Sequence, residues 1–350
     1  MRPPSPAALA APILRAASAP VARLVGAHAP HEGRLPAAPR FRPHARSARY
    51  AWTHYGLMIP DLPAPHRFFS FMSLVGATGS LIFDTDAARV DRPRRTATLV
   101  NATAATAPGH FRAYSIPREC AFADDGSLVR FGDDAELTGL HPSFRLRGLR
   151  DDFPYDLRIS CGEQVTFFVR GPLWQHFGIL SRYEGTIGDE AVAGHCSFEY
   201  GACALSPHMV TGLPLPRALK LPGDRFVYNI LALGPGRQLL LSNVGLAGQP
   251  LVEAAYLRDV DGTTRRTVRG VRATVTAAAS ATTTPDGREA RLPERLRWRG
   301  PGIEIEAVID TPMVFGLGSG HVGGCAFRGT LDGDPIAGRG YLEHIDRSAG

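Results

Sequence analysis

The sequence lacks the signatures of several large protein classes. No apolar run reaches the length of a membrane-spanning helix. There is no G-x-S-x-G elbow, no G-x-x-x-x-G-K-[ST] loop and no H-E-x-x-H pair, which argues against elbow-type hydrolases, P-loop nucleotide enzymes and zincins. The glycine-rich stretch 316–320 misses the spacing of a dinucleotide-binding loop, and we interpret it as a loop between strands. Lysine is nearly absent, since Lys220 is the only one among 350 residues.

Cysteine is scarce and scattered. The five cysteines are not grouped in pairs two to four positions apart, as a zinc site requires, and their odd number argues against a complete disulfide framework. We therefore expect buried thiols, no metal, no cofactor and a cytoplasmic protein. The five residues are Cys120, Cys161, Cys196, Cys203 and Cys325.

The positive net charge of +6 is confined to the N-terminus. Residues 1–50 hold eight arginines against one acid, which gives +7 and leaves −1 for the rest of the chain. A nearly neutral body has no general field that attracts phosphate, so we expect no nucleic-acid partner. Residues 1–48 also contain nine prolines and fourteen alanines, which predicts a disordered tail. A targeting peptide or a weak membrane-surface contact is the alternative for this tail.

The two halves of the chain share three segments in the same order. Residues 185–200 (GTIGDEAVAGHCSFEY) align without a gap with 329–344 (GTLDGDPIAGRGYLEH), and five of these sixteen positions are identical. The other two matches are 157–160 with 296–299, which would make Leu157 and Leu296 equivalent, and 65–71 with 235–241. A shared order of matches predicts that the unit has been duplicated.

Local patterns indicate that the repeated unit is built of strands. Ile303–Ile309 begins with strict alternation, and 96–103, 164–170 and 272–279 have the composition and length of strands. Asp-Gly pairs suited to hairpins recur between them. We therefore predict an all-β protein with two tandem antiparallel barrel units. The expected divisions are a disordered tail at 1–48, a first unit at 49–206, a linker at 207–223 and a second unit at 224–347.

The segment Gly338–His344 reads Gly-x-Gly-Tyr-x-Glu-His and closes the second unit. Paired β units that end on such a strand resemble the tandem lipocalin-like family, which includes AttH-like proteins and hydroxyneurosporene synthase (carotenoid 1,2-hydratase). The resemblance implies two lipocalin-like barrels, a preference for isoprenoid or other lipid-like ligands, and a member of the family without an assigned function. The Trp-rich, Asp- and His-bearing signature of the hydratases is not evident, so no catalytic residue is carried over.

Glu199 and Glu343 occupy the same position of the repeated segment. If their apolar neighbours point into the barrels, strand alternation directs both glutamates outward. One interpretation gives them a shared structural role, such as pairing with Arg158 and Arg297. In the functional alternative an outer face lines the groove between the units, where a dry carboxyl could keep its proton and act as an acid.

Residues that differ between the copies are candidates for specialisation. His344 stands where the first copy has Tyr200, and it joins the two glutamates as a candidate catalytic residue. The stretches 52–55 and 174–176 each combine a tryptophan with a histidine, which offers apolar area beside one orienting hydrogen bond. Ordinary core or surface packing is the alternative explanation for all of them. The candidate ligand-binding residues are Trp52, His54, Tyr55, Trp174, His176, Tyr200 and Tyr341.

The preferred functional hypothesis is the binding of an apolar small molecule, as a carrier or by sequestration. One barrel, or the seam between two, would enclose an isoprenoid or fatty lipid. The alternative is a hydratase, isomerase or cyclase that acts on a carbon–carbon double bond of such a ligand. That chemistry needs a protonated carboxylic acid, a base that positions water, and a site closed to bulk water. A purely structural interaction module is the third hypothesis.

Overall fold

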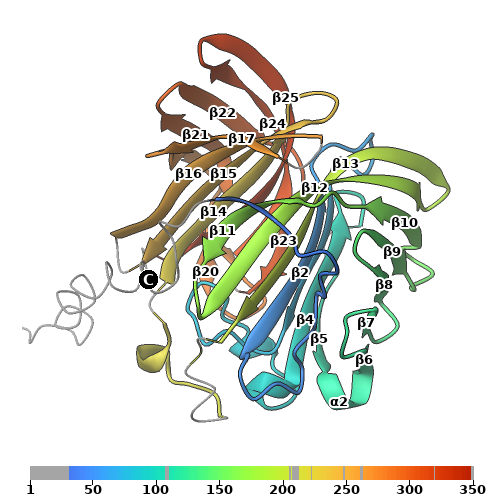
Figure 1. The fold of residues 1–350 in the computed structure, drawn as a ribbon. Coiled ribbons are helices and arrows are strands. Elements are labelled where there is room, and N and C mark those ends of the chain that lie inside the picture. Colours follow the sequence, from blue (N-terminus) through green and yellow to red (C-terminus); the bar gives the residue numbers. More distant parts are fainter. Residues whose placement is uncertain are drawn as a thin grey trace, which may run out of the picture.

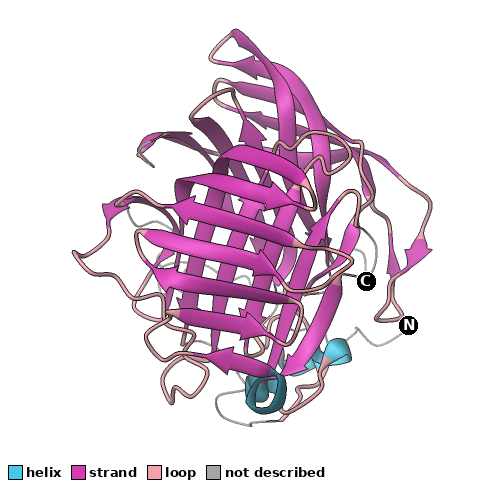
Figure 2. Cartoon of the chain, turned by 90° about the vertical axis from the view of Figure 1, so that its right-hand side faces the viewer, coloured by secondary structure: helices cyan, strands magenta, loops and turns pink. Residues whose placement is uncertain are grey.

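The computed structural model describes residues 31–347, except 107–109, 205, 207–212, 222, 247–248, 261–262 and 319. Strands dominate this part of the chain, and its helices are single short turns that lie at one end of the molecule (Figure 2). Two antiparallel sheets curl into barrel-like units, the first drawn from blue to green and the second from yellow to red (Figure 1). The predicted all-β class with two tandem units is confirmed. No helix in the described residues is long and apolar enough to cross a membrane.

The first unit is a sheet of thirteen strands. Eleven of them follow the order β5-β4-β3-β2-β13-β12-β10-β9-β8-β7-β6, and outside this order β11 pairs with β12 and β1 pairs with β11. Its elements are β1 (Glu32–Arg34), β2 (Trp52–Ile59), β3 (Phe69–Val75), η1 (Asp86–Ala88), η2 (Pro93–Arg95), β4 (Thr96–Thr103), β5 (Phe111–Ser115), α2 (Ile116–Glu119), β6 (Cys120–Phe122), β7 (Leu128–Phe131), β8 (Ala135–Leu140), β9 (Ser143–Gly148), β10 (Tyr155–Ser160), β11 (Gln164–Arg170), β12 (Trp174–Ile187) and β13 (Glu190–Cys203).

The second unit is a sheet of ten strands in the order β17-β16-β15-β14-β25-β24-β22-β21-β18, with β23 paired to β24. A separate two-stranded sheet joins β19 and β20. The elements are η3 (Arg217–Leu219), β14 (Gly223–Ala232), β15 (Arg237–Leu246), β16 (Gln249–Asp259), β17 (Thr264–Arg269), β18 (Arg272–Ala278), β19 (Thr282–Thr283), β20 (Glu289–Ala290), β21 (Pro293–Gly300), β22 (Ile303–Ile309), β23 (Val314–Leu317), β24 (Gly320–Leu331) and β25 (Asp334–Asp346).

The pairing order of the second sheet corresponds strand for strand to the part of the first sheet that runs from β5 to β8, which supports the duplication. The long hairpin β12–β13 corresponds to β24–β25, and the aligned residues Ile187 and Leu331 end the first strand of each. The Asp332-Gly333 turn of the second hairpin has positive φ at both residues, as a tight two-residue hairpin turn requires. The matched segments 65–71 and 235–241 also agree, because β3 and β15 hold the same place in their sheets.

One of the three sequence matches is wrong. Leu157 pairs with Gly185, and the equivalent Gly329 pairs with Ile305 of β22. Ile305 is therefore the counterpart of Leu157, while Leu296 lies one strand away on β21. The short Leu-Arg pattern misled because an inward apolar residue followed by an outward arginine recurs on several strands of both units.

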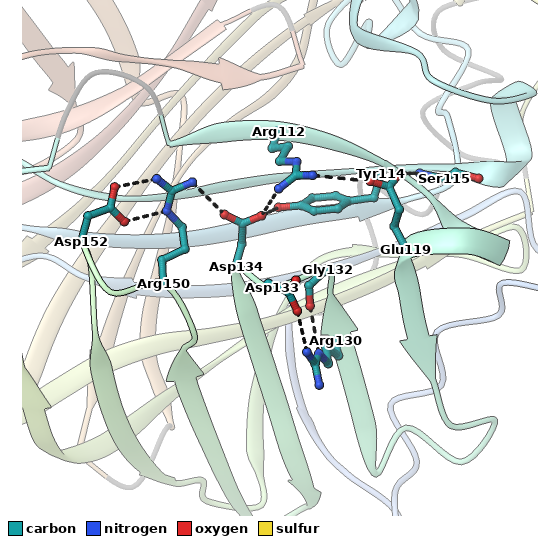
Figure 3. A network of polar contacts seen from close by, with 10 residues as sticks. All are labelled: Arg112, Tyr114, Ser115, Glu119, Arg130, Gly132, Asp133, Asp134, Arg150 and Asp152. Atoms are coloured by element: carbon teal, nitrogen blue, oxygen red, sulfur yellow. Dashed lines mark hydrogen bonds and ion pairs between the residues drawn. The ribbon is translucent and has the colours of Figure 1, made fainter.

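A polar network ties the two ends of the first sheet together and helps to close the unit (Figure 3). Asp134, in the turn before β8, accepts hydrogen bonds from the Tyr114 hydroxyl (2.7 Å) and from Arg112 (3.1 Å), both on β5. Arg150 donates to the same carboxylate at 3.3 Å. Since β5 is one end of the main strand order and Asp134 lies in the β7–β8 turn near the other end, these bonds tie the β5 edge to the opposite part of the sheet.

Three large apolar clusters lie in the interior of the described residues. One fills the first unit and one fills the second. The third lies between the units and combines outward side chains of both, among them Met58, Met72 and Phe168 from the first and Ile230 and Tyr256 from the second. We call this interface the seam. The outer faces of two barrel-like units are thus packed against each other rather than left to solvent.

The prediction that residues 1–48 lack stable structure is wrong for residues 31–48; residues 1–30 lie outside the described residues. Strand β1 pairs with β11, and Phe41 is buried in the core of the first unit. The carbonyl oxygens of Phe41 and Arg42 accept hydrogen bonds from the hydroxyls of Tyr55 (2.6 Å) and Tyr200 (2.8 Å). The high proline content led to a wrong prediction of disorder, because an extended segment can pack against a core without donating backbone hydrogen bonds.

The described part of the predicted linker is also held in place. Lys220 lies in it, and its ammonium group contacts Asp84 at 2.7 Å and Asp86 at 2.6 Å. Residues 207–212 and 222 of the predicted linker lie outside the described residues. The cysteines are free thiols; three are buried and two are half-buried, in line with the expectation.

Replacing Phe41 by Ala should destabilise the first unit strongly. The ring packs against Phe144, Phe198 and Tyr200 with centroids 5.1–5.9 Å away, and truncating a buried phenylalanine costs about 3–5 kcal/mol. Urea unfolding measures the loss, with the exposed neighbour change Arg40→Ala as control. An unchanged midpoint for Phe41→Ala would contradict the placement of this segment in the core.

Candidate functional site at the seam

Three adjacent strands of the first unit, β12, β13 and β2, present their outward side chains to the seam in rows. In one row Glu199 lies between Gly178 and Gly56. In the next row His176 and His54 flank the following outward position of β13. Because strand alternation sends every second side chain to the same face, the glutamate and both histidines converge on one point of the seam.

The two glycines beside Glu199 provide the space for this convergence. A Cβ atom at Gly56 would lie 2.9 Å from Nε2 of His54 and 3.3 Å from Cβ of Glu199. A Cβ atom at Gly178 would lie 2.9 Å from the ring of Phe168. Any larger residue at either place would push the polar groups apart.

The carboxylate of Glu199 is nearly fully buried and well supplied with partners. Its Oε1 accepts hydrogen bonds from the Tyr228 hydroxyl (2.7 Å) and the Ser197 hydroxyl (3.0 Å). Its Oε2 lies 3.3 Å from Nε2 of His176 and 3.9 Å from Nε2 of His54. Burial alone would raise the pKa of Glu199, but the contacts with His176 and Tyr228 outweigh it and hold the pKa below its ordinary value.

The imidazole of His54 is oriented by the backbone of the next strand. Its Nδ1 lies 2.9 Å from the carbonyl oxygen of Ser73, so Nδ1 carries a proton and donates it there. Burial and the neighbouring His176 lower the pKa of His54 to about 4, so the ring is neutral near pH 7. Its Nε2 is then a proton acceptor directed at Glu199.

Glu343 is the counterpart of Glu199 in the second unit, and its surroundings differ. In its row on β25 it pairs with Tyr228, the residue that corresponds to Gly56. Its Oε1 accepts a hydrogen bond from the Tyr341 hydroxyl at 3.0 Å, and that hydroxyl lies 3.0 Å from the Ser70 hydroxyl across the seam. Burial and the charge of Glu199 raise the pKa of Glu343 to about 8, so it holds its proton near neutral pH.

An arginine of the second unit completes the polar centre. Arg258 of β16 is fully buried, and its Nη2 donates to the Ser197 hydroxyl (3.1 Å) and to Oε1 of Gln238 (2.8 Å). Ser197 in turn donates to Glu199, so one hydroxyl links the guanidinium to the carboxylate. Burial lowers the pKa of Arg258, and the nearby Glu199 and Tyr228 oppose that shift.

The histidines and Glu199 could also hold a metal ion. Their ligand atoms lie within 4.8 Å of one another, and two imidazoles with one carboxylate form a donor set that suits zinc or iron. The hydrogen bond from His54 to Ser73 would serve as the outer support that metal-bound histidines commonly have. The same atoms are equally suited to pass a proton.

The structure separates the sequence candidates into three groups. Glu199, Glu343, His54, His176 and Tyr341 meet at the seam. Trp52 and Trp174 lie in the next row along β2 and β12, with ring centroids 5.6 Å apart, at an end of the seam where Trp174 is only half-buried. The remaining three candidates, Tyr55, Tyr200 and His344, lie elsewhere.

Those three residues occupy the inner faces of the barrels. Tyr55 and Tyr200 belong to the core of the first unit and bind the N-terminal segment. His344 lies on the opposite face of β25 from Glu343, in register with His321. Their positions explain them as packing residues of each unit.

The predicted pairing of the two glutamates with Arg158 and Arg297 is wrong. Arg158 lies 3.7 Å from Glu184, and both side chains are exposed. Arg297 is an exposed residue of β21. Neither arginine reaches the seam, because the packing of the outer faces turned both glutamates into buried residues.

Four polar residues of the site were missed from the sequence: Ser197, Tyr228, Gln238 and Arg258. The one signal for Arg258 was a charged residue directly after the mostly apolar stretch 250–257. Ser197 lies two positions before Glu199, so strand alternation places both on the same outward face. Nothing local marks Tyr228 or Gln238, since they reach the site only through the packing of the units.

The fold defines the chain as a tandem lipocalin-like protein. A putative AttH from Nitrosomonas europaea matches with a TM-score of 0.54 at 13% identity, over 85% of this chain and 92% of that one. Kievitone hydratase from Nectria haematococca matches with a TM-score of 0.51 at 12% identity, over 89% and 95%. A search of curated proteins found no match. The chain belongs to a family of unknown function, DUF6670, whose model matches residues 72–349.

The stability of the protein should fall as pH rises through the pKa of Glu343. A carboxyl with a folded pKa of about 8 and an ordinary value of 4.5 binds more protons folded than unfolded, so its contribution is complete below pH 4.5 and is lost towards pH 8. Melting temperatures across this range measure the effect. Glu343→Gln should remove it, whereas the exposed change Glu184→Gln should keep it; equal profiles for all three proteins would refute the protonated state.

Proposed function

We propose that this protein is an acid–base enzyme of the hydratase or isomerase type that acts on an apolar small molecule bound at the seam. The observation that carries the proposal is the pair of equivalent glutamates, which are both buried but held in opposite protonation states. Titratable groups whose surroundings drive their pKa values apart are the usual sign of an acid and a base.

Each partner of the pair has a role that its contacts support. Glu343 is the proton donor, since it is buried and keeps its proton near neutral pH. Glu199 with His176 and His54 is the acceptor that removes a proton from water or from the substrate. The Tyr228 hydroxyl, bonded to Glu199, fixes the direction of the carboxylate.

The surroundings favour an apolar substrate. Met58, Met72, Phe168 and Ile230 line the seam, and both glutamates are at most 5% exposed. An isoprenoid or fatty compound with a carbon–carbon double bond fits such walls. One solved structure of the same fold is a hydratase by name, which is compatible with this chemistry.

Labelled water tests the proposal even while the substrate is unidentified. The apolar fraction of a cell extract is incubated with the protein in ¹⁸O-water, and mass spectrometry follows compounds that gain labelled oxygen. Glu343→Gln should lower the rate by about 10²–10⁴-fold, because a positioned acid contributes that much. Glu199→Gln should behave alike, and Glu184→Gln should match the wild type.

A chelator separates proton transfer from metal chemistry in the same assay. Turnover that survives chelation supports the roles given to Glu199 and the histidines. Turnover that is lost and then restored by zinc would make the three residues metal ligands instead. A ligand that is retained but never changed, with no label gained by any compound, would leave the carrier function in place of the enzyme.

A further inference from the structure

Arg258 is the group at the seam that acid–base chemistry does not use. It is 0% exposed, and a guanidinium in such a place needs partners for its donors. Its Nη2 has two, the Ser197 hydroxyl and the Gln238 carbonyl oxygen. Within the described residues, no carboxylate lies within ion-pair distance of it, and Nε and Nη1 have no hydrogen-bond partner.

Gln238 adds a further donor at the same place. It is 1% exposed, its oxygen is used by Arg258, and its Nε2 has no partner among the described residues. The unused atoms of both side chains are all donors. Buried donors of this kind are satisfied by an oxygen acceptor, and a positively charged cluster prefers an oxygen that bears negative charge.

The position of these donors relates them to the reacting groups. Ser197 bonds both Arg258 and Glu199, so the guanidinium lies one hydroxyl away from the base. The side chain crosses from the second unit to the first, and a Cβ atom at Gly178 would lie 3.2 Å from Nη1. A larger residue at this position would crowd that donor and the ring of Phe168.

We infer that Arg258 and Gln238 bind the carbonyl oxygen of the substrate, and that the substrate is an apolar compound whose double bond is conjugated to this carbonyl. The inference rests on the proposed function and specifies its substrate class. Donors fixed where negative charge develops stabilise the transition state, as in other oxyanion sites.

The addition of water to such an enone balances with the groups present. Glu199 takes a proton from water while the oxygen of that water forms a bond to the β-carbon. The electron pair of the C=C bond moves to form a new double bond between the α-carbon and the carbonyl carbon, and the carbonyl pair moves to its oxygen at Arg258. Collapse of this enolate returns that pair to the carbonyl, and the α-carbon takes the proton of Glu343. The net change is one water added across the double bond, with the proton on Glu199 returned to Glu343 through solvent.

Two matched probes test the subsite by binding alone. β-Ionone is an isoprenoid enone, and β-ionol is the same skeleton with an alcohol in place of the carbonyl. Tryptophan quenching measures both affinities, and we expect β-ionone to bind about tenfold tighter or more, as a charged hydrogen bond would give. The ultraviolet band of bound β-ionone should also lie at longer wavelength than in hydrocarbon solvent, because a cationic donor at the carbonyl lowers the excitation energy.

Variants assign the effect to the two side chains. Arg258→Met and Gln238→Met should each reduce the preference for β-ionone, while the exposed neighbour change Arg237→Met should keep it. If circular dichroism shows that Arg258→Met does not fold, the inference is tested by the ultraviolet band of β-ionone bound to the wild type and by the affinities of Gln238→Met for the two probes. Equal affinity for both probes together with a hydrocarbon-like band in the wild type would overturn the inference.

The binding test of the carbonyl subsite can succeed or fail independently of the turnover test of the proposed function. Glu343→Gln should keep the preference for β-ionone even though it stops turnover. If the protein binds β-ionone more tightly than β-ionol but no compound gains label, the carbonyl subsite is supported and the proposed enzyme activity is refuted. If an alkene without a carbonyl gains label in a reaction that needs Glu343, and both probes bind equally, the enzyme activity is supported and the carbonyl subsite is refuted.

Discussion

The packing of two outer barrel faces against each other is the constraint on which the site depends. Each unit has its own filled core, so its outward strand residues would ordinarily face water. At the seam those residues are buried instead, and duplication has placed a glutamate at the same outward position of both units. Two like charges in one dry interface cannot both be ionised at modest cost. The protein resolves this conflict by giving the two carboxyls different partners.

Divergence between equivalent positions supplies those partners. Where β2 has Gly56, β14 has Tyr228, whose hydroxyl crosses to Glu199. Where β2 has His54, β14 has Phe226, so the imidazoles serve only the first glutamate. Glu343 keeps the donor from Tyr341 on its own strand and has no imidazole among its hydrogen-bond partners in the described residues. A symmetric duplication has thus become a chemically asymmetric pair, which is the arrangement that acid–base catalysis needs.

The strands and the duplication were readable from the sequence because they follow local rules. Alternation and β-rich composition predicted β4, β11 and β22 with the bounds that the structure has, and the gapless match of 185–200 with 329–344 predicted that these segments are equivalent in the two units. The N-terminal segment was misjudged, since the burial of Phe41 depends on a cavity formed by distant aromatic rings. Chain composition cannot report such a cavity.

About half of the candidate site could be read from the sequence, for a related reason. Strand alternation turned Glu199 and Glu343 to the outer faces, and the two tryptophan–histidine stretches contain His54 and His176, which the structure places beside Glu199. Which outer faces meet is a property of the assembled units, and one sequence contains no local signal for it. Arg258 therefore stayed unnoticed, although it reaches Ser197 from a strand sixty-one positions further along the chain.

Infrared difference spectroscopy of the carboxyl groups tests the central claim most directly. The wild-type spectrum minus that of Glu343→Gln should show a protonated carboxyl band at pH 7 that disappears as pH rises through about 8. The corresponding difference for Glu199→Gln should show an ionised carboxylate at pH 7. Two ionised carboxylates, or two protonated carboxyls, would contradict the assignment of an acid and a base at the seam.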